Sequence, residues 1–333
     1  MKTKVITQEN IHEAAKCLAD GGTVVFPTET VYGLGADAFN DDAVSKIFEA
    51  KGRPGDNPLI VHISHVSQLS RLAKNVSPRA KLLIEKFWPG PLTLILPKCD
   101  SVSSRVTAGL ETVAVRFPSN PIAQSLISLS GTLVAAPSAN LSGSPSPTVC
   151  ADVVDDLDGR VDYIIDGTGC EIGLESTVVD VSTGKTVVLR PGGVTLEMIK
   201  ELIPDAELDK GLIDADSVPK CPGLKYTHYS PKADVIVVQG EKKNVRAYIG
   251  SMLSQNSDCG VLTYGGGTYD GAKLVLDAGA DMTSYAHNLF SHLRTFDKHG
   301  VCTVYAEFNP ENGMGTAVRN RLYKAAGHKI VEV

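Results

Sequence analysis

The periodic spacing of apolar residues lapses between Pro204 and Pro231 and then resumes with a different succession of strand-like and helix-like segments. Before this gap, strand-like and helix-like segments mix without a regular βαβ repeat, which predicts a large twisted mixed sheet with helices packed on it. After the gap, strands and helices alternate as in a small parallel α/β domain. A chain of 333 residues also exceeds the size that one hydrophobic core usually supports. We therefore predict domains at 1–208 and 232–333, joined by a linker at 209–231.

Hydroxyls, glycines and cations gather early in the chain, where a strand and a helix both end. The apolar run Thr23–Phe26 predicts a buried strand, and the proline after it begins a turn. Apolar residues recur at helical spacing from Asp41 to Lys51, which predicts a helix. Gly52 suits the left-handed conformation found just past a helix C-terminus. Lys51 and Arg53 flank this stop, which predicts a site for phosphates or small anions. Basic residues near a helix C-terminus can also simply complement the helix dipole.

The cysteine pattern, the N-terminal sequence and the distribution of prolines exclude several classes of protein. The seven cysteines are scattered, with no C-x-x-C pair and no H-E-x-x-H motif, so neither a disulfide framework nor a structural zinc site is supported. The N-terminus lacks the apolar core of a signal peptide, and prolines interrupt the uncharged stretch 117–151. We therefore expect a reducing, cytoplasmic location and no contact with a membrane.

Two glycine-containing stretches do not fit nucleotide-binding motifs. Gly265–Gly267 follows a strand, but Asp270 stands where G-x-G-x-x-G requires its last glycine. Gly184 begins a Gly-Lys-Thr sequence like the end of a Walker A motif, but Val179 stands where the first glycine should be. We therefore predict neither a dinucleotide site nor a Walker A loop.

Four further motifs follow strands of the first domain. They are VAVRFP with Arg116, PSAN-x-SG at 137–143, ESTVVD with Ser176, and LRPGG with Arg190. Taken singly, each has an ordinary explanation, such as a surface ion pair for an arginine at a strand end or a Ser/Asn turn for PSAN. His62, inside an apolar strand, could likewise be a core histidine.

Taken together, the motifs resemble a known family in composition and in order. With PTET-x-YGL at 27–34, KGRP at 51–54 and NPL at 57–59, the chain resembles the YrdC-like family, and within it the two-domain threonylcarbamoyl-AMP synthases. HYSP at 228–231 and GMGTAVRNRL at 313–322 extend the resemblance over nearly the whole chain.

The resemblance implies a fold and an activity. The fold is α/β, with a YrdC-like twisted mixed sheet and packed helices, plus a smaller Rossmann-like parallel α/β C-terminal domain. The activity is a nucleotidyltransferase that combines L-threonine, bicarbonate and ATP, with Mg²⁺, into threonylcarbamoyl-AMP and pyrophosphate. The product passes to partner proteins that modify an adenosine of tRNA next to the anticodon, with at most weak RNA contact by this chain. In the family the linker reaches back over the catalytic cavity, so we expect it to act as a lid.

The resemblance also assigns residues, with no metal ligand among them. Lys51 and Arg53 are the catalytic cations, and they bind the ATP phosphates together with Asn57. The remaining nucleotide-binding candidates are Thr112, Ser138, Asn140, Ser146, Arg190 and Tyr229. The candidates for threonine and its carbamate are Thr30, Tyr32, His62, Arg116 and Ser176. Arg116 suits a carboxylate because its planar guanidinium can bind in a bidentate manner. No residue stands out as a general base.

Two other functions stay open at this stage. A non-catalytic RNA-binding module could use the same cations for backbone phosphates, although residues 1–210 hold 19 Lys and Arg against 26 Asp and Glu. A carbamoyl-adenylate enzyme of the hydrogenase-maturation type shares the YrdC-like domain. That class expects carbamoyl phosphate as substrate and zinc-finger segments, and this chain has no C-x-x-C pairs.

Overall fold

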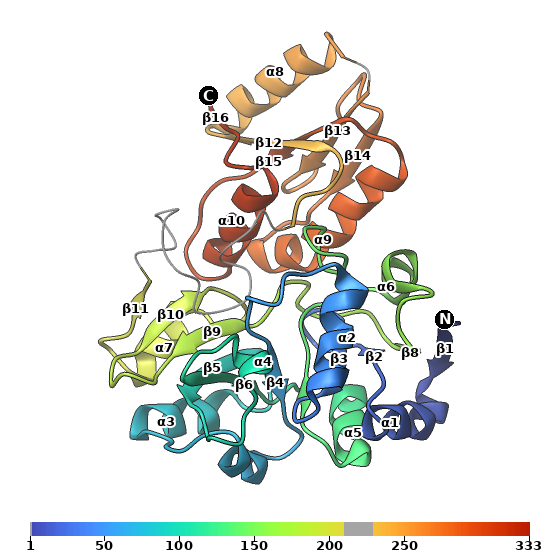
Figure 1. The fold of residues 1–333 in the computed structure, drawn as a ribbon. Helices are drawn as coiled ribbons and strands as arrows, with labels where there is room; N and C mark the ends of the chain where they lie inside the picture. Colours follow the sequence, from blue (N-terminus) through green and yellow to red (C-terminus); the bar gives the residue numbers. More distant parts are fainter. Residues whose placement is uncertain (1, 210–228, 257) are drawn as a thin grey trace. The chain divides into compact units, whose positions relative to one another are not determined.

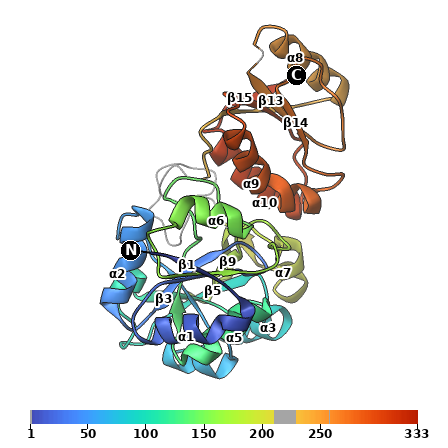
Figure 2. The same cartoon turned by 90° about the vertical axis from the view of Figure 1, so that its right-hand side faces the viewer.

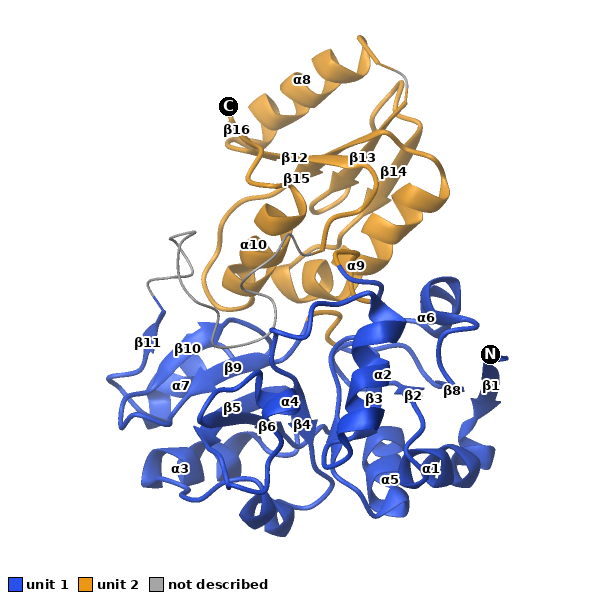
Figure 3. Ribbon diagram, in the orientation of Figure 1, with its two compact units in different colours: residues 1–142, 147–171, 175–226 blue, residues 143–146, 172–174, 227–333 orange. Residues whose placement is uncertain are grey.

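The computed structural model describes residues 2–209, 229–256 and 258–333, which form two compact units (Figures 1 and 3). Unit 1 comprises 1–142, 147–171 and 175–226, and unit 2 comprises 143–146, 172–174 and 227–333. Two short segments from the N-terminal half of the chain therefore belong with the C-terminal unit. Most of the predicted linker, including His228, lies outside the described residues, so its role as a lid stays a prediction.

Unit 1 is built on a mixed sheet of eleven strands, which confirms the predicted architecture. Its strands are β1 (Lys4–Thr7), β2 (Val24–Phe26), β3 (Gly33–Asp37), β4 (Ile60–His62), β5 (Leu92–Pro97), β6 (Thr112–Arg116), β7 (Val134–Ala135), β8 (Tyr163–Asp166), β9 (Thr177–Asp180), β10 (Val187–Arg190) and β11 (Glu207–Leu208). Their order across the sheet is β1-β8-β2-β3-β7-β4-β6-β5-β9-β10-β11. Parallel and antiparallel ladders alternate irregularly along this order.

Most helices of unit 1 begin at a residue whose side chain caps the first turn, whereas α1 and α6 have no such cap. They are α1 (Ile11–Ala19), α2 (Asp41–Lys51), α3 (Pro78–Phe87), α4 (Ser104–Thr107), α5 (Pro121–Ser130), α6 (Cys150–Leu157) and α7 (Leu196–Leu202), with 3₁₀ turns at Gln8–Asn10 and Val66–Arg71. The Asn40 side chain accepts a hydrogen bond at the start of α2, and Gly52 ends this helix with φ 60°. Ser77 caps α3 in front of Pro78. These caps fix where the Lys51 side chain leaves its helix.

Strand β3 was not predicted, because its sequence GLGAD lacks strand-forming residues. It is a strand because β2 and β7 pair with it on both sides. A Cβ atom on Gly35 would lie 2.5 Å from Cγ1 of Val134, so only glycine allows this close approach.

The two faces of the sheet differ where β4, β5, β6 and β9 run side by side. One face carries Val61, Leu94, Val115 and Val179, which belong to the main hydrophobic core. The opposite face carries only a small apolar cluster of Ile60, Ile95, Ala114, Val178 and Leu189. Side chains alternate between the two faces along a strand, so residues two positions further along these strands share the face of the small apolar cluster. These residues are not part of a large hydrophobic core, and they can be polar.

Unit 2 is a parallel α/β structure, as predicted. Its strands are β12 (Asp234–Gln239), β13 (Cys259–Thr263), β14 (Leu274–Asp277), β15 (Thr303–Glu307) and β16 (Ile330–Glu332), and its helices are α8 (Lys242–Leu253), α9 (Met282–Lys298) and α10 (Met314–Ala325). All ladders are parallel, in the order β14-β13-β15-β12-β16. Helix α8 lies on one face of this sheet, with α9 and α10 on the other (Figure 2). Within the described parts of the chain, no helix is long and apolar enough to cross a bilayer.

Candidate active site

A row of polar residues crosses neighbouring strands of unit 1. His62 on β4 lies opposite Arg116 on β6, which lies opposite Thr93 on β5. Thr93 pairs with Val178 on β9, and Val178 pairs with Arg190 on β10. Directly opposed residues share one face of a sheet. His62, Thr93, Arg116 and Arg190, which we call the polar row, therefore lie on the face of the small apolar cluster.

Arg190 reaches this face because β10 contains an irregularity. Val188 lies opposite Val179, but the next registered residue, Arg190, lies opposite Val178, so two residues of β10 match one step of β9. In regular pairing Leu189 would face Val178, and Arg190 would point to the other side of the sheet. The bulge thus turns the Arg190 side chain toward the face that carries Arg116.

Ser176 connects the far end of the polar row through its side chain. Its Oγ atom lies 2.8 Å from Oγ1 of Thr93 and accepts a hydrogen bond of 3.1 Å from Nη2 of Arg190. Nε of Arg190 also donates to the Ser176 carbonyl oxygen at 3.0 Å. All three side chains are buried. Two predicted binding residues, Ser176 and Arg190, are therefore held in one hydrogen-bonded group.

Arg116 forms a buried ion pair with Glu29, a residue that the sequence analysis did not select. Nη2 of Arg116 lies 2.8 Å from Oε1 of Glu29, and Oε2 of Glu29 accepts a hydrogen bond from the Ser119 backbone. The Nε atom of Arg116 is buried and has no hydrogen-bond partner among the described residues, and the contact between Nη2 and Oε1 of Glu29 is an ion pair without hydrogen-bond geometry. A buried donor without a partner is costly and is uncommon in native structures. The position of Glu29 inside the PTET motif, between two hydroxyls, was the available signal.

His62 is neutral in this environment. Burial, and secondarily the neighbouring Arg116 guanidinium, lower the pKa of His62 to about 3. Its Nδ1 atom lies 3.2 Å from the Ile60 carbonyl oxygen, and its ring meets the Phe26 ring edge-on at 6.1 Å between centroids. His62 can therefore take part in hydrogen bonds on the polar row, but it does not add a positive charge near neutral pH.

A second group of candidates surrounds the end of α2. Nζ of Lys51 donates hydrogen bonds to the carbonyl oxygens of Ser138, at 2.6 Å, and Asn140. The Ser138 hydroxyl donates to Oδ1 of Asn140 at 2.5 Å, and the Ser142 backbone donates to the Lys51 carbonyl oxygen. Lys51 is only 3% exposed. We call Lys51, Ser138 and Asn140 the Lys51 cluster.

Arg53 and Asn57 lie on the loop that follows Lys51. Arg53 is half-buried, and its Nη2 atom lies 3.5 Å from the Pro58 carbonyl oxygen. Asn57 is 1% exposed, and its Oδ1 atom has no hydrogen-bond partner among the described residues. The loop that carries Arg53 therefore also carries a buried amide acceptor whose hydrogen bonding a ligand could complete.

The loop between β2 and β3 connects the polar row with the Lys51 cluster. At one end Glu29 reaches Arg116. At the other end, the Tyr32 carbonyl oxygen accepts from the Ala139 backbone at 2.8 Å, next to Ser138. Between them the Oγ1 atoms of Thr28 and Thr30 lie 2.9 Å apart. Both groups therefore belong to one connected structure in unit 1.

The Tyr32 side chain also holds its loop in place, and its threonine-binding role stays a prediction. It is fully buried, its hydroxyl donates to the Gly167 carbonyl oxygen at 3.3 Å, and it accepts from the Gly167 backbone at the same distance. Burial raises the pKa of Tyr32. These contacts anchor the loop in the core.

Three candidates belong to neither of these groups. Thr112 is half-buried at the opposite end of β6 from Arg116, about 13 Å away along an extended strand. Ser146 is fully buried and belongs to unit 2. Tyr229, also in unit 2, has φ 67° and stacks on Phe290 with 5.2 Å between ring centroids. Their binding roles stay predictions.

The described residues offer no dedicated metal centre. No group of three or more His, Cys, Asp or Glu side chains in the described ranges is arranged to hold a metal ion. The donors that gather in unit 1 are instead cations, hydroxyls and an amide, which are groups that bind anionic ligands.

Family models match nearly the whole chain. A model described as "Telomere recombination", which groups the Sua5, YciO and YrdC proteins, matches residues 16–192. A model described as "Threonylcarbamoyl-AMP synthase, C-terminal domain" matches residues 194–327. The two models meet near the end of the mixed-sheet part of the chain.

Relatives of similar length carry a single functional name. The threonylcarbamoyl-AMP synthase of Bacillus subtilis is 49% identical over 326 residues, which are 96% of this chain and 94% of that protein. The threonylcarbamoyl-AMP synthase of Pyrococcus abyssi is 47% identical over 331 residues, covering 98% and 97%. A crystal structure of P. abyssi Sua5 complexed with L-threonine superposes with a TM-score of 0.95 at 45% identity, over all of both chains.

Proposed function

Because the chain belongs to the threonylcarbamoyl-AMP synthase family, we propose that unit 1 holds L-threonine at the His62 and Arg116 end of the polar row, and ATP at the Lys51 cluster and at Arg190, the other end of that row. The chain is a nucleotidyltransferase that forms threonylcarbamoyl-AMP, rather than a non-catalytic RNA-binding module. The relatives that span the whole chain also favour this activity over the carbamoyl-adenylate alternative. What we propose beyond the activity is the role of each residue.

The observation that carries the threonine assignment is the buried Nε–H group of Arg116, which lacks a partner among the described residues. Glu29 holds one side of the guanidinium, and a substrate carboxylate would accept from the Nε side. Thr30 and Ser176 supply hydroxyls, and neutral His62 supplies a ring nitrogen, for the threonine hydroxyl and the carbamate. The L-threonine bound to the similar P. abyssi protein supports a threonine site in this fold.

The ATP assignment rests on the burial of cations beside backbone and amide groups. Lys51, Arg53 and Asn57 would hold the phosphates, with Ser138, Asn140 and Arg190 around the remainder of the nucleotide. Thr112, Ser146 and Tyr229 stay secondary nucleotide candidates. We propose that Mg²⁺ enters with ATP as part of the substrate, held mainly by phosphate oxygens.

The charges of the site suit a reaction between anions. The threonine amine attacks bicarbonate and water leaves, which gives a carbamate. A carbamate oxygen then attacks the α-phosphorus of ATP, and the bond to the departing pyrophosphate breaks. Buried cations offset the repulsion between these reactants in a medium of low dielectric, and their fixed positions bring the reactants together. His62 is too weak a base to remove a proton near neutral pH, because its pKa is about 3.

The product implies the partners and the compartment. We propose that threonylcarbamoyl-AMP passes to separate proteins that modify tRNA, and that this occurs in the cytoplasm. The excess of acidic residues over 1–210 argues that any RNA contact by this chain is weak.

The proposed function is tested by measuring pyrophosphate release from ATP while each substrate is omitted in turn. Release should require both L-threonine and bicarbonate, and R116K should raise the KM for threonine more than that for ATP. Release at an equal rate without threonine would contradict the proposal.

A further inference from the structure

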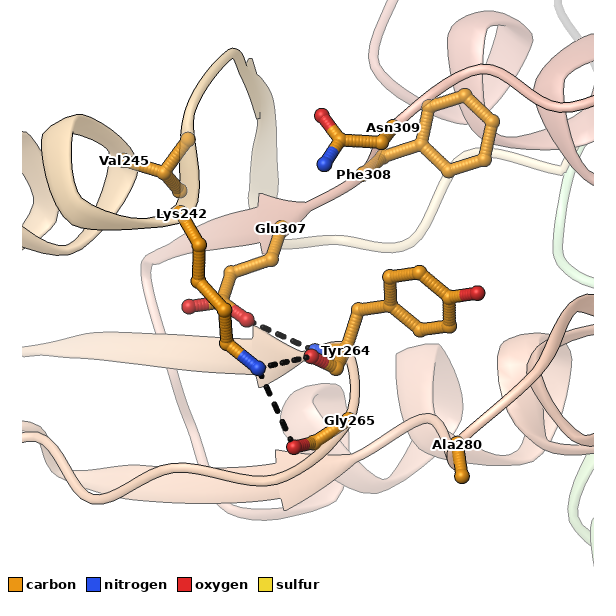
Figure 4. A pocket seen from close by; sticks show the side chains of 8 residues that line it. All are labelled: Lys242, Val245, Tyr264, Gly265, Ala280, Glu307, Phe308 and Asn309. Atoms are coloured by element: carbon orange, nitrogen blue, oxygen red, sulfur yellow. Dashed lines mark hydrogen bonds between the residues drawn. The ribbon is translucent and has the colours of Figure 1, made fainter.

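Unit 2 contains a pocket of about 240 Å³ at the carboxyl ends of its parallel strands (Figure 4). Its lining residues are Lys242, Val245, Tyr264, Gly265, Ala280, Glu307, Phe308 and Asn309. They come from the first turns of α8, from the segment after β13, from the segment between β14 and α9, and from the end of β15 and the residues after it. None of them belongs to the candidate active site.

The strand order makes this position a natural binding site. β12 and β15 are neighbours, but the chain leaves β12 toward β13 on one side and leaves β15 toward β16 on the other. The first connection passes over β15 and the second passes over β12, and their helices, α8 and α10, lie on opposite faces of the sheet, so the segments after β12 and β15 turn toward opposite faces above the carboxyl ends of the strands. Ligands of open α/β sheets bind at such a switch point.

The α8 side of the pocket carries a lysine. Lys242 and Lys243 occupy the first turn of α8, which has no acidic residue, and the N-cap residue, Glu241, makes no side-chain cap. Cations at this end oppose the helix dipole, whereas a bound anion would complement both. Nζ of Lys242 has only long contacts, 3.5 Å to the Tyr264 carbonyl oxygen and 3.4 Å to that of Gly265, and forms no ion pair within the described residues. Its ammonium group can therefore donate to a ligand.

The pocket also contains a buried carboxylate. Glu307 is 5% exposed, and its oxygens accept one hydrogen bond from the Tyr264 backbone, at 2.8 Å, and one from the Tyr269 hydroxyl. A carboxylate can accept about four hydrogen bonds, so capacity remains for a donor in the pocket. Oδ1 of Asn309 accepts from the Gly240 backbone, which leaves the Asn309 amide nitrogen as a further donor.

We propose that this pocket binds a small anion-bearing metabolite no larger than a nucleoside monophosphate. A phosphate or carboxylate group binds Lys242 and the first turn of α8, and a hydroxyl or amine of the same molecule donates to Glu307. The volume lies below the roughly 300–1,000 Å³ of pockets for larger ligands, which excludes a dinucleotide. Gly265, with φ 70°, is in the left-handed conformation that favours glycine.

The test is hydrogen–deuterium exchange and calorimetry on the full chain with AMP as the main probe. Inorganic phosphate tests the anion alone, and L-threonine tests a carboxylate with an amine. AMP or threonine should slow exchange at 240–247 and 263–268, and this protection should persist in K51A. K242A should weaken the binding by about tenfold or more, as loss of a charged hydrogen bond predicts.

Two variants make the result specific. K243A removes the same charge from the same turn of α8 but not from the pocket lining, and should change affinity by less than about twofold. E307Q should reduce affinity for AMP or threonine but not for phosphate, with thermal unfolding measured to confirm that it folds. The proposal is overturned if none of the three probes protects unit 2 at millimolar concentration, or if K242A and K243A have equal effects.

Discussion

The carboxylate oxygen Oε1 of Glu29 lies 2.8 Å from Nη2 of Arg116, and both side chains are only 5% exposed. Removing two charges from water is expensive, and a buried pair is stable only when its geometry and additional hydrogen bonds are good. Glu29 has such a bond from the Ser119 backbone, whereas Nε of Arg116 has no partner among the described residues. The pair therefore fixes the guanidinium while leaving one edge of it available to a substrate.

The first prediction concerns Glu29. E29Q keeps the size of the side chain but leaves the Arg116 charge buried without its partner, so the free energy of unfolding should fall by about 3–5 kcal/mol. Urea denaturation measures this change. E85Q, at an exposed glutamate on α3, is the matched control and should stay within about 0.5 kcal/mol of the wild type. An equal effect of both variants would show that the ion pair contributes nothing.

The second prediction separates the two substrates. R116K keeps a positive charge but loses the planar fork and its Nε–H group, so the KM for L-threonine should rise about tenfold or more. The KM for ATP should change much less. Steady-state kinetics with each substrate varied in turn gives both constants. A larger effect on ATP would mean that the assignments of the two halves of the site are exchanged.

The third prediction distinguishes the cations on the phosphate side. Both K51A and R53A should lose most ATP-dependent turnover. R53A should melt close to the wild type because Arg53 is half-buried. K51A should also melt lower, since it leaves the carbonyl oxygens of Ser138 and Asn140 without their donor, at about 1–3 kcal/mol for a buried group.

Turnover and thermal unfolding, measured on the same preparations, test this prediction. K46A is the matched control because Lys46 is an exposed lysine on the same helix, α2. It should retain turnover. Full activity of R53A would remove Arg53 from the site.

The fourth prediction concerns pH. The pKa of His62 is about 3 in the folded chain and about 6.5 when exposed, so the unfolded state binds a proton that the folded state excludes. The contribution of His62 to stability is therefore complete above about pH 6.5 and declines as the pH falls, by about 2–3 kcal/mol at pH 4.5. H62Q should flatten this part of the stability profile in urea denaturation. H12Q, at an exposed histidine on α1, should keep the wild-type profile; an unchanged slope in H62Q would contradict the burial of a neutral His62.

Much of the fold and of the site could be predicted from the sequence, because helix caps and strand ends depend on residues that are close together in the chain. Asn40 and Gly52 set the limits of α2, and Arg116 stands at the end of β6 as its apolar run indicates. The orientation of Arg190 was not predictable, because it depends on a bulge in the pairing of β10 with β9. Glu29 was missed for a similar reason, since its partner lies 87 positions away in the sequence.

The domain limits show the same distinction between local and long-range information. The change of periodicity near 204–231 indicated two domains, and two compact units are found. Residues 143–146 belong to unit 2, where the Arg294 side chain donates two hydrogen bonds to the Pro145 carbonyl oxygen. A pattern along the chain cannot reveal such an excursion, because the contact joins segments far apart in the sequence.

The most direct test of the central claim is mass spectrometry of the nucleotide formed from ATP, L-threonine and isotope-labelled bicarbonate. We expect an adenylate that contains threonine and one labelled carbon. It should form together with pyrophosphate and be absent in R53A. AMP or ADP without a labelled threonine adduct, or an adduct formed equally well by R53A, would contradict it.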